Sequence, residues 1–395
     1  MTIRKQLRWA GLLIILISLL VNGAGILIYS GGKTAILQAV YGLGFTGLVL
    51  ACSMIHIAQA RRSGWLGSIA YPVTVLGLAY ANINNFLTLA ERVGIPDAHE
   101  TYVSLGEALP LPHLAAYSAF IGFTLLGFSV TMAGVFPRWS GVLIALGSAL
   151  QIPAQFAMEL SGPLTIGGSI LLGAGLVWIG WSFWSGKGWN MEEPGLSHPD
   201  RIWGGPVVML AGFLLAVDAN VNLFGGLNLT SGLTHILSIT LNVLAVFLIF
   251  GAFAERANWT GLTGIILAQL GTMLYFSTAF FIVAQLAGAI DNNSMLMATW
   301  VELPIGRTGQ YLTILGMLLL SIGAIRSEVF PPWSGWLVLI GIALAFPFTF
   351  SVQDYFLGIF WVIGGTIEGM GVIWMGWAVL AANKPVTLPA SQYNG

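Results

Sequence analysis

The sequence has little charge and a single cysteine. Only 7% of its 395 residues are charged, against about 25% in soluble domains, while 57% are hydrophobic. The formal net charge is -1, and the few cations fall in short turns, so the chain offers no basic surface for nucleic acid. Cys52 alone cannot form an intrachain disulfide or a multi-thiolate metal site. These shortages exclude a soluble globular protein and indicate that the lipid bilayer is the solvent.

Long apolar runs are what the chain has instead. They include residues 114–135, 233–253 and 335–350, and a membrane-spanning helix needs about 20 such residues. We therefore expect an all-α, polytopic membrane protein.

One phrase occurs twice at a fixed distance. Residues 135–141 read VFPRWSG and residues 329–335 read VFPPWSG, a step of 329 − 135 = 194. The same step relates Arg62 to Arg256 and Trp65 to Trp259, and near the end of each unit the step becomes 196. A register kept over so many positions predicts a duplicated unit, residues 1–195 and 196–395, arranged as parallel repeats.

Each unit divides into six apolar spans, which predicts twelve transmembrane helices as two parallel six-helix repeats. The first six are expected at residues 9–28, 35–59, 65–90, 113–135, 140–160 and 164–185. The second six are expected at residues 204–224, 232–253, 260–289, 308–326, 334–351 and 357–381.

The distribution of Lys and Arg favours one orientation in the cell membrane. With the N-terminus inside, eleven basic residues fall on the cytoplasmic side and only Lys33, Arg92 and Arg307 fall outside. Both termini are then expected to be cytoplasmic. A cleaved signal peptide is the less favoured alternative, because an even repeat requires the first helix as the partner of residues 204–224.

The repeated phrase has a structural interpretation. Pro137 and Pro331 stop one helix because proline lacks the amide proton, and Trp139 and Trp333 suit the headgroup boundary. Ser140 and Ser334 are expected to cap the next helix.

Each half resembles a bacterial six-helix membrane family of unknown function. The resemblance rests on FPRWSG before the fifth helix, on VGIPDA (residues 93–98) in a polar segment after the third, and on the spacing of the six spans. The second half departs from it, since Pro332 replaces Arg138 and the polar segment is shorter. The resemblance implies a topology and no activity.

Polar residues inside the spans are the functional candidates, because they are costly in lipid and usually face a bundle interior. They concentrate in the predicted outer halves of the helices, which suggests an outward-facing vestibule with Glu368 as its deepest ionisable group. The candidate ligand- or ion-binding residues are Asp218, Glu368, Asn222, Asn82, Asn85 and Glu159.

The two central acids have no counterparts in the first half. Asp218 corresponds to Ala24 at the step of 194, and Glu368 corresponds to Leu172 at the step of 196. We expect an asymmetric site where the halves meet, in which these carboxyls handle a ligand or ion; neutral, hydrogen-bonded carboxyls are the alternative. For Glu159 a structural role is favoured, and the histidines, His56 and His235 among them, are expected to be interfacial.

The leading function is a transporter or permease-like protein for a small solute or cation. The alternative is a non-transporting sensor or accessory subunit that binds a lipid or small amphiphile, and a membrane enzyme ranks third. No nucleotide-binding, catalytic or metal-binding motif is found, so no cofactor, metal or enzymatic activity is expected. The expected partners are the lipid bilayer and a small-molecule or cation ligand.

Reporter fusions test the orientation. Fusions at residue 190 and at the C-terminus should report the cytoplasm, and a fusion within residues 96–107 should report the outside, because basic loops resist translocation. One reversed reporter would contradict the twelve-helix topology.

Overall fold

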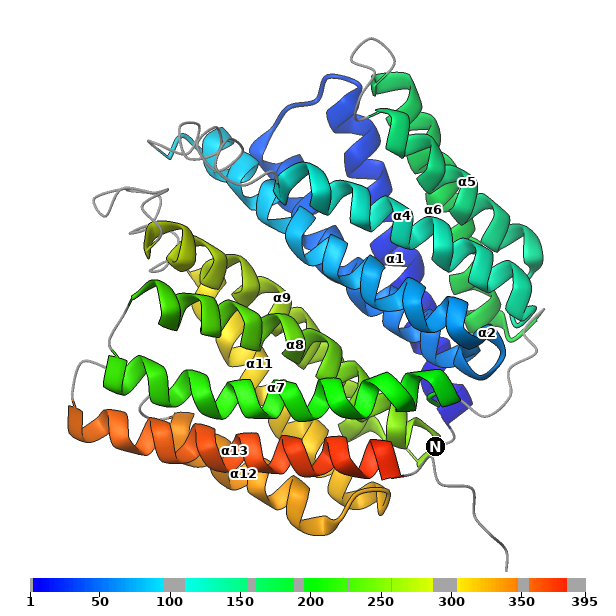
Figure 1. Cartoon of the computed structure of the whole chain (residues 1–395). Coiled ribbons are helices and arrows are strands. Elements are labelled where there is room, and N and C mark those ends of the chain that lie inside the picture. The colour runs from blue at the N-terminus through cyan, green and yellow to red at the C-terminus, as the bar shows by residue number, and fades with distance from the viewer. Residues whose placement is uncertain are drawn as a thin grey trace, which may run out of the picture.

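The structure, a computed structural model, consists of helices in every part of the chain that it describes (Figure 1). The described residues are 3–95, 111–154, 161–187, 195–225, 228–256, 258–286, 304–346 and 355–381. In Figure 1 the helices of the first half gather in one bundle and those of the second half in another beside it.

The described residues of the first bundle form five continuous helical elements. They are α1 (Ile3–Tyr29), α2 (Ala35–Arg92), α4 (Leu111–Ala133), α5 (Arg138–Ala154) and α6 (Ser161–Ser185). The long α2 holds two of the expected spans, because the chain turns at Gly64, whose φ of 54° and ψ of -145° are not helical. Glycine reaches such positive φ values at no steric cost, so it permits the reversal.

Over its described ranges the second bundle consists of six α-helices and a short 3₁₀ turn. They are α7 (His198–Gly225), α8 (Leu229–Phe253), η1 (Ala254–Arg256), α9 (Trp259–Leu286), α11 (Pro304–Ser327), α12 (Pro332–Ala345) and α13 (Tyr355–Ala381).

With α2 counted as two helices, the described residues place a helix at each of the twelve expected spans. Eight of the described helices are long and apolar enough to cross a membrane, and Tyr117–Ala133 and Pro332–Ala345 are shorter apolar helices. The chain is an all-α polytopic membrane protein.

The same order of helix neighbours occurs in both bundles. In the first, α1 packs on α2 and α6, α2 on α4, α4 on α5, and α5 on α6. In the second, α7 packs on α8 and α13, α8 on α9, α9 on α11, α11 on α12, and α12 on α13. With α2 counted as two, the described helices of each bundle therefore form a closed ring of six.

Glycines let neighbouring helices approach until their backbones touch. A Cβ atom on Gly316 of α11 would lie 2.1 Å from the Ala268 backbone nitrogen of α9, and one on Gly271 would lie 2.2 Å from the Thr313 nitrogen. Between α7 and α13, Gly212 and Gly369 face each other's carbonyl oxygens in the same way. In lipid, where apolar side chains gain little by leaving the solvent, such close packing is a main source of helix association.

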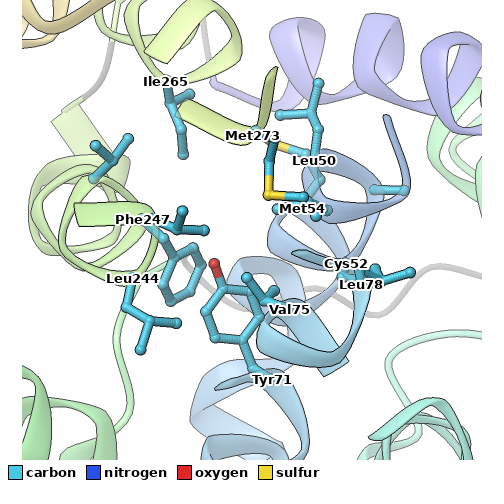
Figure 2. Packing of buried hydrophobic residues seen from close by; sticks show 14 of the residues in the cluster. Leu50, Cys52, Met54, Tyr71, Val75, Leu78, Leu244, Phe247, Ile265 and Met273 are labelled. Atoms are coloured by element: carbon cyan, nitrogen blue, oxygen red, sulfur yellow. The ribbon is translucent and has the colours of Figure 1, made fainter. Parts of the chain in front are cut away.

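The two bundles meet along α2, which packs against α7, α8 and α9. Figure 2 shows the apolar core there, with Tyr71 and Val75 of α2 beside Leu244 and Phe247 of α8. The rings of Tyr71 and Phe247 have centroids 3.9 Å apart. All four side chains are buried, so this contact is the apolar centre between the bundles.

The repeated phrase forms a turn in both bundles, with one difference from the prediction. Trp139 and Trp333 are 69% and 70% exposed, as suits rings at a headgroup boundary, and the phenylalanine before each proline is buried. The expectation that the serines cap the helices is wrong. Ser140 and Ser334 lie inside the first turn, where their hydroxyls donate to the carbonyl oxygens of Pro137 and Pro331 at 2.6 and 2.7 Å.

Adding one methyl group tests the glycine contacts. Gly316→Ala should lower the thermal stability of the purified protein, because the new Cβ would meet the α9 backbone, and overpacking costs about 1 to 3 kcal/mol. Gly167→Ala in α6 is the control, since nothing lies within 4 Å of its Cβ position. Equal unfolding temperatures for the two variants would contradict the packing argument.

The turn makes a separate prediction. Arg138→Ala should leave expression and stability unchanged because the side chain is exposed, while Pro137→Ala combined with Trp139→Ala should lower both, because these residues end the helix and anchor it. Normal stability in the double variant would show that the phrase is not a structural turn.

Candidate functional site

The second bundle encloses a cavity of about 510 Å³. All six of its described α-helices contribute to the walls, so the cavity is the centre of the ring. Its lining is mainly apolar, with polar groups on several sides. The polar lining residues are Asp218, His235, Ser238, Asn242, Thr272, Tyr275, Thr278, Arg307, Gln310, Thr313 and Glu368, and the large apolar ones include Ile314, Met317, Ile342, Phe346 and Trp361.

Helical periodicity explains why these residues share the cavity. On α8 the polar lining residues are His235, Ser238 and Asn242, which are spaced by three and four. On α11 they are Arg307, Gln310 and Thr313, spaced by three. Residues at these intervals lie on one face of a helix, so each helix turns one mixed face toward the centre.

The contact between α7 and α13 holds the two predicted acids. A Cβ atom on Gly365 would lie 2.8 Å from the Ala219 Cβ, so the two helices touch at this level. Asp218 precedes Ala219, and Glu368 lies one turn beyond Gly365 on the same face. Both carboxyl groups line the cavity. The structure thus brings together two residues that are 150 positions apart in the sequence (368 − 218).

Asp218 is the end of a chain of three hydrogen-bonded side chains. Its Oδ2 lies 2.7 Å from His235 Nδ1, and His235 Nε2 lies 3.1 Å from the Tyr275 hydroxyl. The Asp218 and His235 side chains are 10% and 20% exposed. Because one imidazole nitrogen faces each oxygen, the ring can accept a proton on one side and donate one on the other.

Glu368 has a different environment. It is partly buried, and no described residue gives its carboxyl group a hydrogen bond or an ion pair. On α12, Gly341 leaves room for it, since a Cβ there would lie 2.4 Å from the Glu368 backbone nitrogen. A carboxyl without a partner in a cavity of low polarity must bind a proton or a cation to avoid the cost of a bare charge.

A cation, Arg307, also lines the cavity. It is exposed and comes three residues after the start of α11. Glu368 lies near the middle of α13, 13 residues from either end. The cavity therefore carries an arginine near the helix ends and a carboxyl group deeper among the helices.

Two other predicted site residues lie elsewhere. Asn82 and Asn85 are in the first bundle and do not line this cavity. The Asn82 amide donates to Thr46 Oγ1 at 2.9 Å, and Gln38 donates to Asn85 Oδ1 at 3.4 Å. These bonds join the two segments of α2, so both asparagines contribute to packing within α2.

The side chains of the remaining two candidates, Asn222 and Glu159, lie outside the described residues. The backbone of Asn222 belongs to α7, but its side chain is outside the described residues. Glu159 lies entirely outside them.

Two histidine predictions are wrong. His235 lines the cavity and His56 is fully buried, so neither is an interfacial side chain. The cavity that Asp218 and Glu368 line lies within the second bundle, whereas the sequence led us to expect a site where the two halves meet. For the histidines, their places near the predicted helix ends and the lack of ligand spacing favoured the interface. The periodic spacing of His235, Ser238 and Asn242 was the signal for a buried face.

Within the described residues, no group of three or more His, Cys, Asp or Glu side chains is arranged to hold a metal ion. The lining offers two carboxyls, one of them already engaged by a histidine. It suits an organic ligand better than a chelated metal.

Comparisons with known proteins add little. No family model and no curated protein matches the chain. A MOP superfamily transporter from Pyrococcus furiosus aligns with 15% identity over 97% of this chain and 96% of that one, with a TM-score of 0.23. The outward-facing conformation of a multidrug resistance MATE family transporter of the same superfamily aligns with 15% identity over 97% and 94%, with a TM-score of 0.22. At such TM-scores these alignments carry no argument about fold or function.

Proposed function

We propose that the protein is a membrane transporter for a small solute that carries a positive charge, and that the cavity of the second bundle is its binding site. The observation that carries the proposal is the Glu368 carboxyl group, which lines an otherwise mainly apolar cavity and has no partner among the described residues. A ligand cation would supply the missing charge.

The size and walls of the cavity support this choice of ligand. A volume of about 510 Å³ falls in the range of small-molecule sites. Trp361 precedes Glu368 by seven residues on α13, which is two turns along the same face, and Met317 and Ile342 line the same space. An apolar body can pack on these side chains, the indole ring included, while its cationic group approaches the carboxyl.

Asp218 has a separate role in the proposal. Because it is bonded to His235, its charge is already engaged, and the chain to Tyr275 can take up or release a proton. Proton movement on this chain would change the charge of the cavity while Glu368 holds the solute. The transporter would therefore exchange or carry protons with its substrate.

The same proposal includes the arrangement in the membrane. We place both termini in the cytoplasm and the mouth of the cavity, near Arg307, on the outside, as the Lys and Arg distribution favours. The units 1–195 and 196–395 are taken as parallel repeats, supported by the equal order of helix neighbours, and as tandem members of the six-helix family that each half resembles.

Binding of an organic cation tests the site. Glu368→Gln should weaken binding of tetraphenylphosphonium to the protein in nanodiscs by about tenfold or more, because the amide keeps the shape but loses the charge. Glu328→Gln is the matched control, since Glu328 is exposed and lies outside the cavity. Equal loss in both variants, or none in Glu368→Gln, would contradict the role of Glu368.

Flux separates the transporter from the alternative. The parent protein in liposomes should move tetraphenylphosphonium in response to a pH gradient, and Asp218→Asn should abolish the dependence on that gradient, because the histidine loses its charged partner. Tight binding that depends on Glu368 without any flux would instead identify a sensor or accessory subunit.

A further inference from the structure

A second cluster of buried polar groups lies between the two bundles, apart from the cavity. His56 of α2 and Asp200 of α7 are both 0% exposed. The His56 Nε2 atom lies 3.3 and 3.2 Å from the two carboxylate oxygens of Asp200. The pair connects the first bundle to the first turn of the second bundle.

The start of α7 fixes the Asp200 carboxylate in place. Its Oδ2 accepts hydrogen bonds from the Ser197 backbone nitrogen at 3.0 Å and from the Ser197 hydroxyl at 2.6 Å. In return, the Asp200 backbone nitrogen donates to Ser197 Oγ at 3.1 Å. This reciprocal arrangement is a capping box, so the carboxylate that stabilises the helix start is also the partner of His56.

The segment before α7 is itself held between the bundles. Leu196 is buried against α8 at Gly251, where a Cβ atom would lie 2.5 Å from the leucine side chain. Ser68 of α2 lies 3.2 Å from Ser197, hydroxyl to hydroxyl. Arg61 of α2 pairs with Glu255 of η1 beside this segment. We call His56, Asp200, Ser197, Ser68, Arg61 and Glu255 the joint.

The surroundings of His56 are apolar and closed. Its ring stacks on Tyr71 with centroids 5.1 Å apart and an interplanar angle of 19°, and Phe247 of α8 is 5.4 Å away. The Nδ1 atom is buried and has no hydrogen-bond partner among the described residues. Water therefore cannot solvate either member of the pair while the bundles are in contact.

We propose that His56 is a proton-binding site that controls contact between the two bundles at the joint. With a proton, His56 and Asp200 form a pair of zero net charge. Without it, the buried site keeps a net negative charge, and an uncompensated buried charge is strongly destabilising. Proton binding thus favours the closed joint, and deprotonation as the pH rises favours separation that lets water reach Asp200.

The other ionisable groups near His56 do not change this sign. On α2 they are Cys52, Tyr71 and Arg61; on α7 they are Asp200 and Arg201; on η1 there is Glu255. From α8 and α9 the described neighbours are the uncharged Phe247 and Gln269, the latter bonded to Ser53. Of these side-chain types, histidine is the one that ordinarily serves as a proton switch at physiological pH.

The position of the joint gives the closure a function. Its residues lie close to the turn at Gly64, the start of α7 and the end of α8, which is the end predicted to face the cytoplasm. Separation there would let water from the cytoplasmic side enter the space between the two bundles. The proposal concerns this movement alone and does not depend on which solute the cavity binds.

A distance measurement between spin labels tests the proposal. The labels are attached after Trp65→Cys and Trp259→Cys substitution of exposed residues in α2 and α9, in a Cys52→Ala background of the full chain in nanodiscs. Between about pH 5.5 and about pH 8.5, the fraction of molecules with the longer distance should rise about threefold or more, because the pair loses its compensating charge.

Variants of the pair should remove this response. His56→Gln and Asp200→Asn each remove the titrating pair, so both should show a distance distribution that does not change with pH. His198→Gln is the control, an exposed histidine two residues from Asp200, and should respond as the parent does. A parent protein whose distances do not change with pH overturns the proposal, as does a pH response that persists in either pair variant. If the parent protein shows the pH-dependent distances but does not transport tetraphenylphosphonium, the proposed function of the cavity fails and the proposal for the joint stands.

Discussion

Contact between helix backbones in lipid is the constraint on which this structure depends. Apolar side chains gain little when they move from lipid to protein, so the helices associate through close packing at small residues. The glycines at 212, 316 and 369 all sit where a Cβ atom would meet a neighbouring backbone. Such contacts close each ring of six helices. The approach of Gly365 to the Ala219 Cβ also sets the level at which Asp218 and Glu368 face the cavity.

The two rings differ in what fills them. At the positions that correspond to Asp218, Asn242 and Glu368, the first half carries Ala24, Leu48 and Leu172, all buried. The second half therefore lines its centre with polar groups where the first half places apolar side chains. A difference confined to such positions leaves the helix contacts of both rings intact, because those depend on the glycines.

Glu368 and the two acid–histidine pairs of the described residues fall into two sites with different surroundings. The cavity combines Glu368, which has no partner, with Asp218, which is bonded to His235. The joint between the bundles holds His56 and Asp200 in complete burial. One site has room for a ligand, and the other has room only for a proton. The division separates binding of a solute from movement of the bundles.

The sequence by itself determined the class of protein, the positions of the helices and two central residues of the cavity. Hydrophobic runs placed all twelve spans because apolar length is a local property of the chain. Asp218 and Glu368 could be selected because an acid in an apolar run is unusual wherever the helix points. Asn82 and Asn85 met the same criterion, yet they bond within α2.

Only the tertiary structure decided the partners. That His235 faces Asp218, and that His56 meets Asp200 from 144 residues away, depends on how helices pack and rotate. Spacing by three and four shows that residues share one face of a helix. Contacts between distant segments decide which neighbouring helix that face meets. The sequence therefore revealed which groups are costly in the membrane, and the fold decided what compensates each of them.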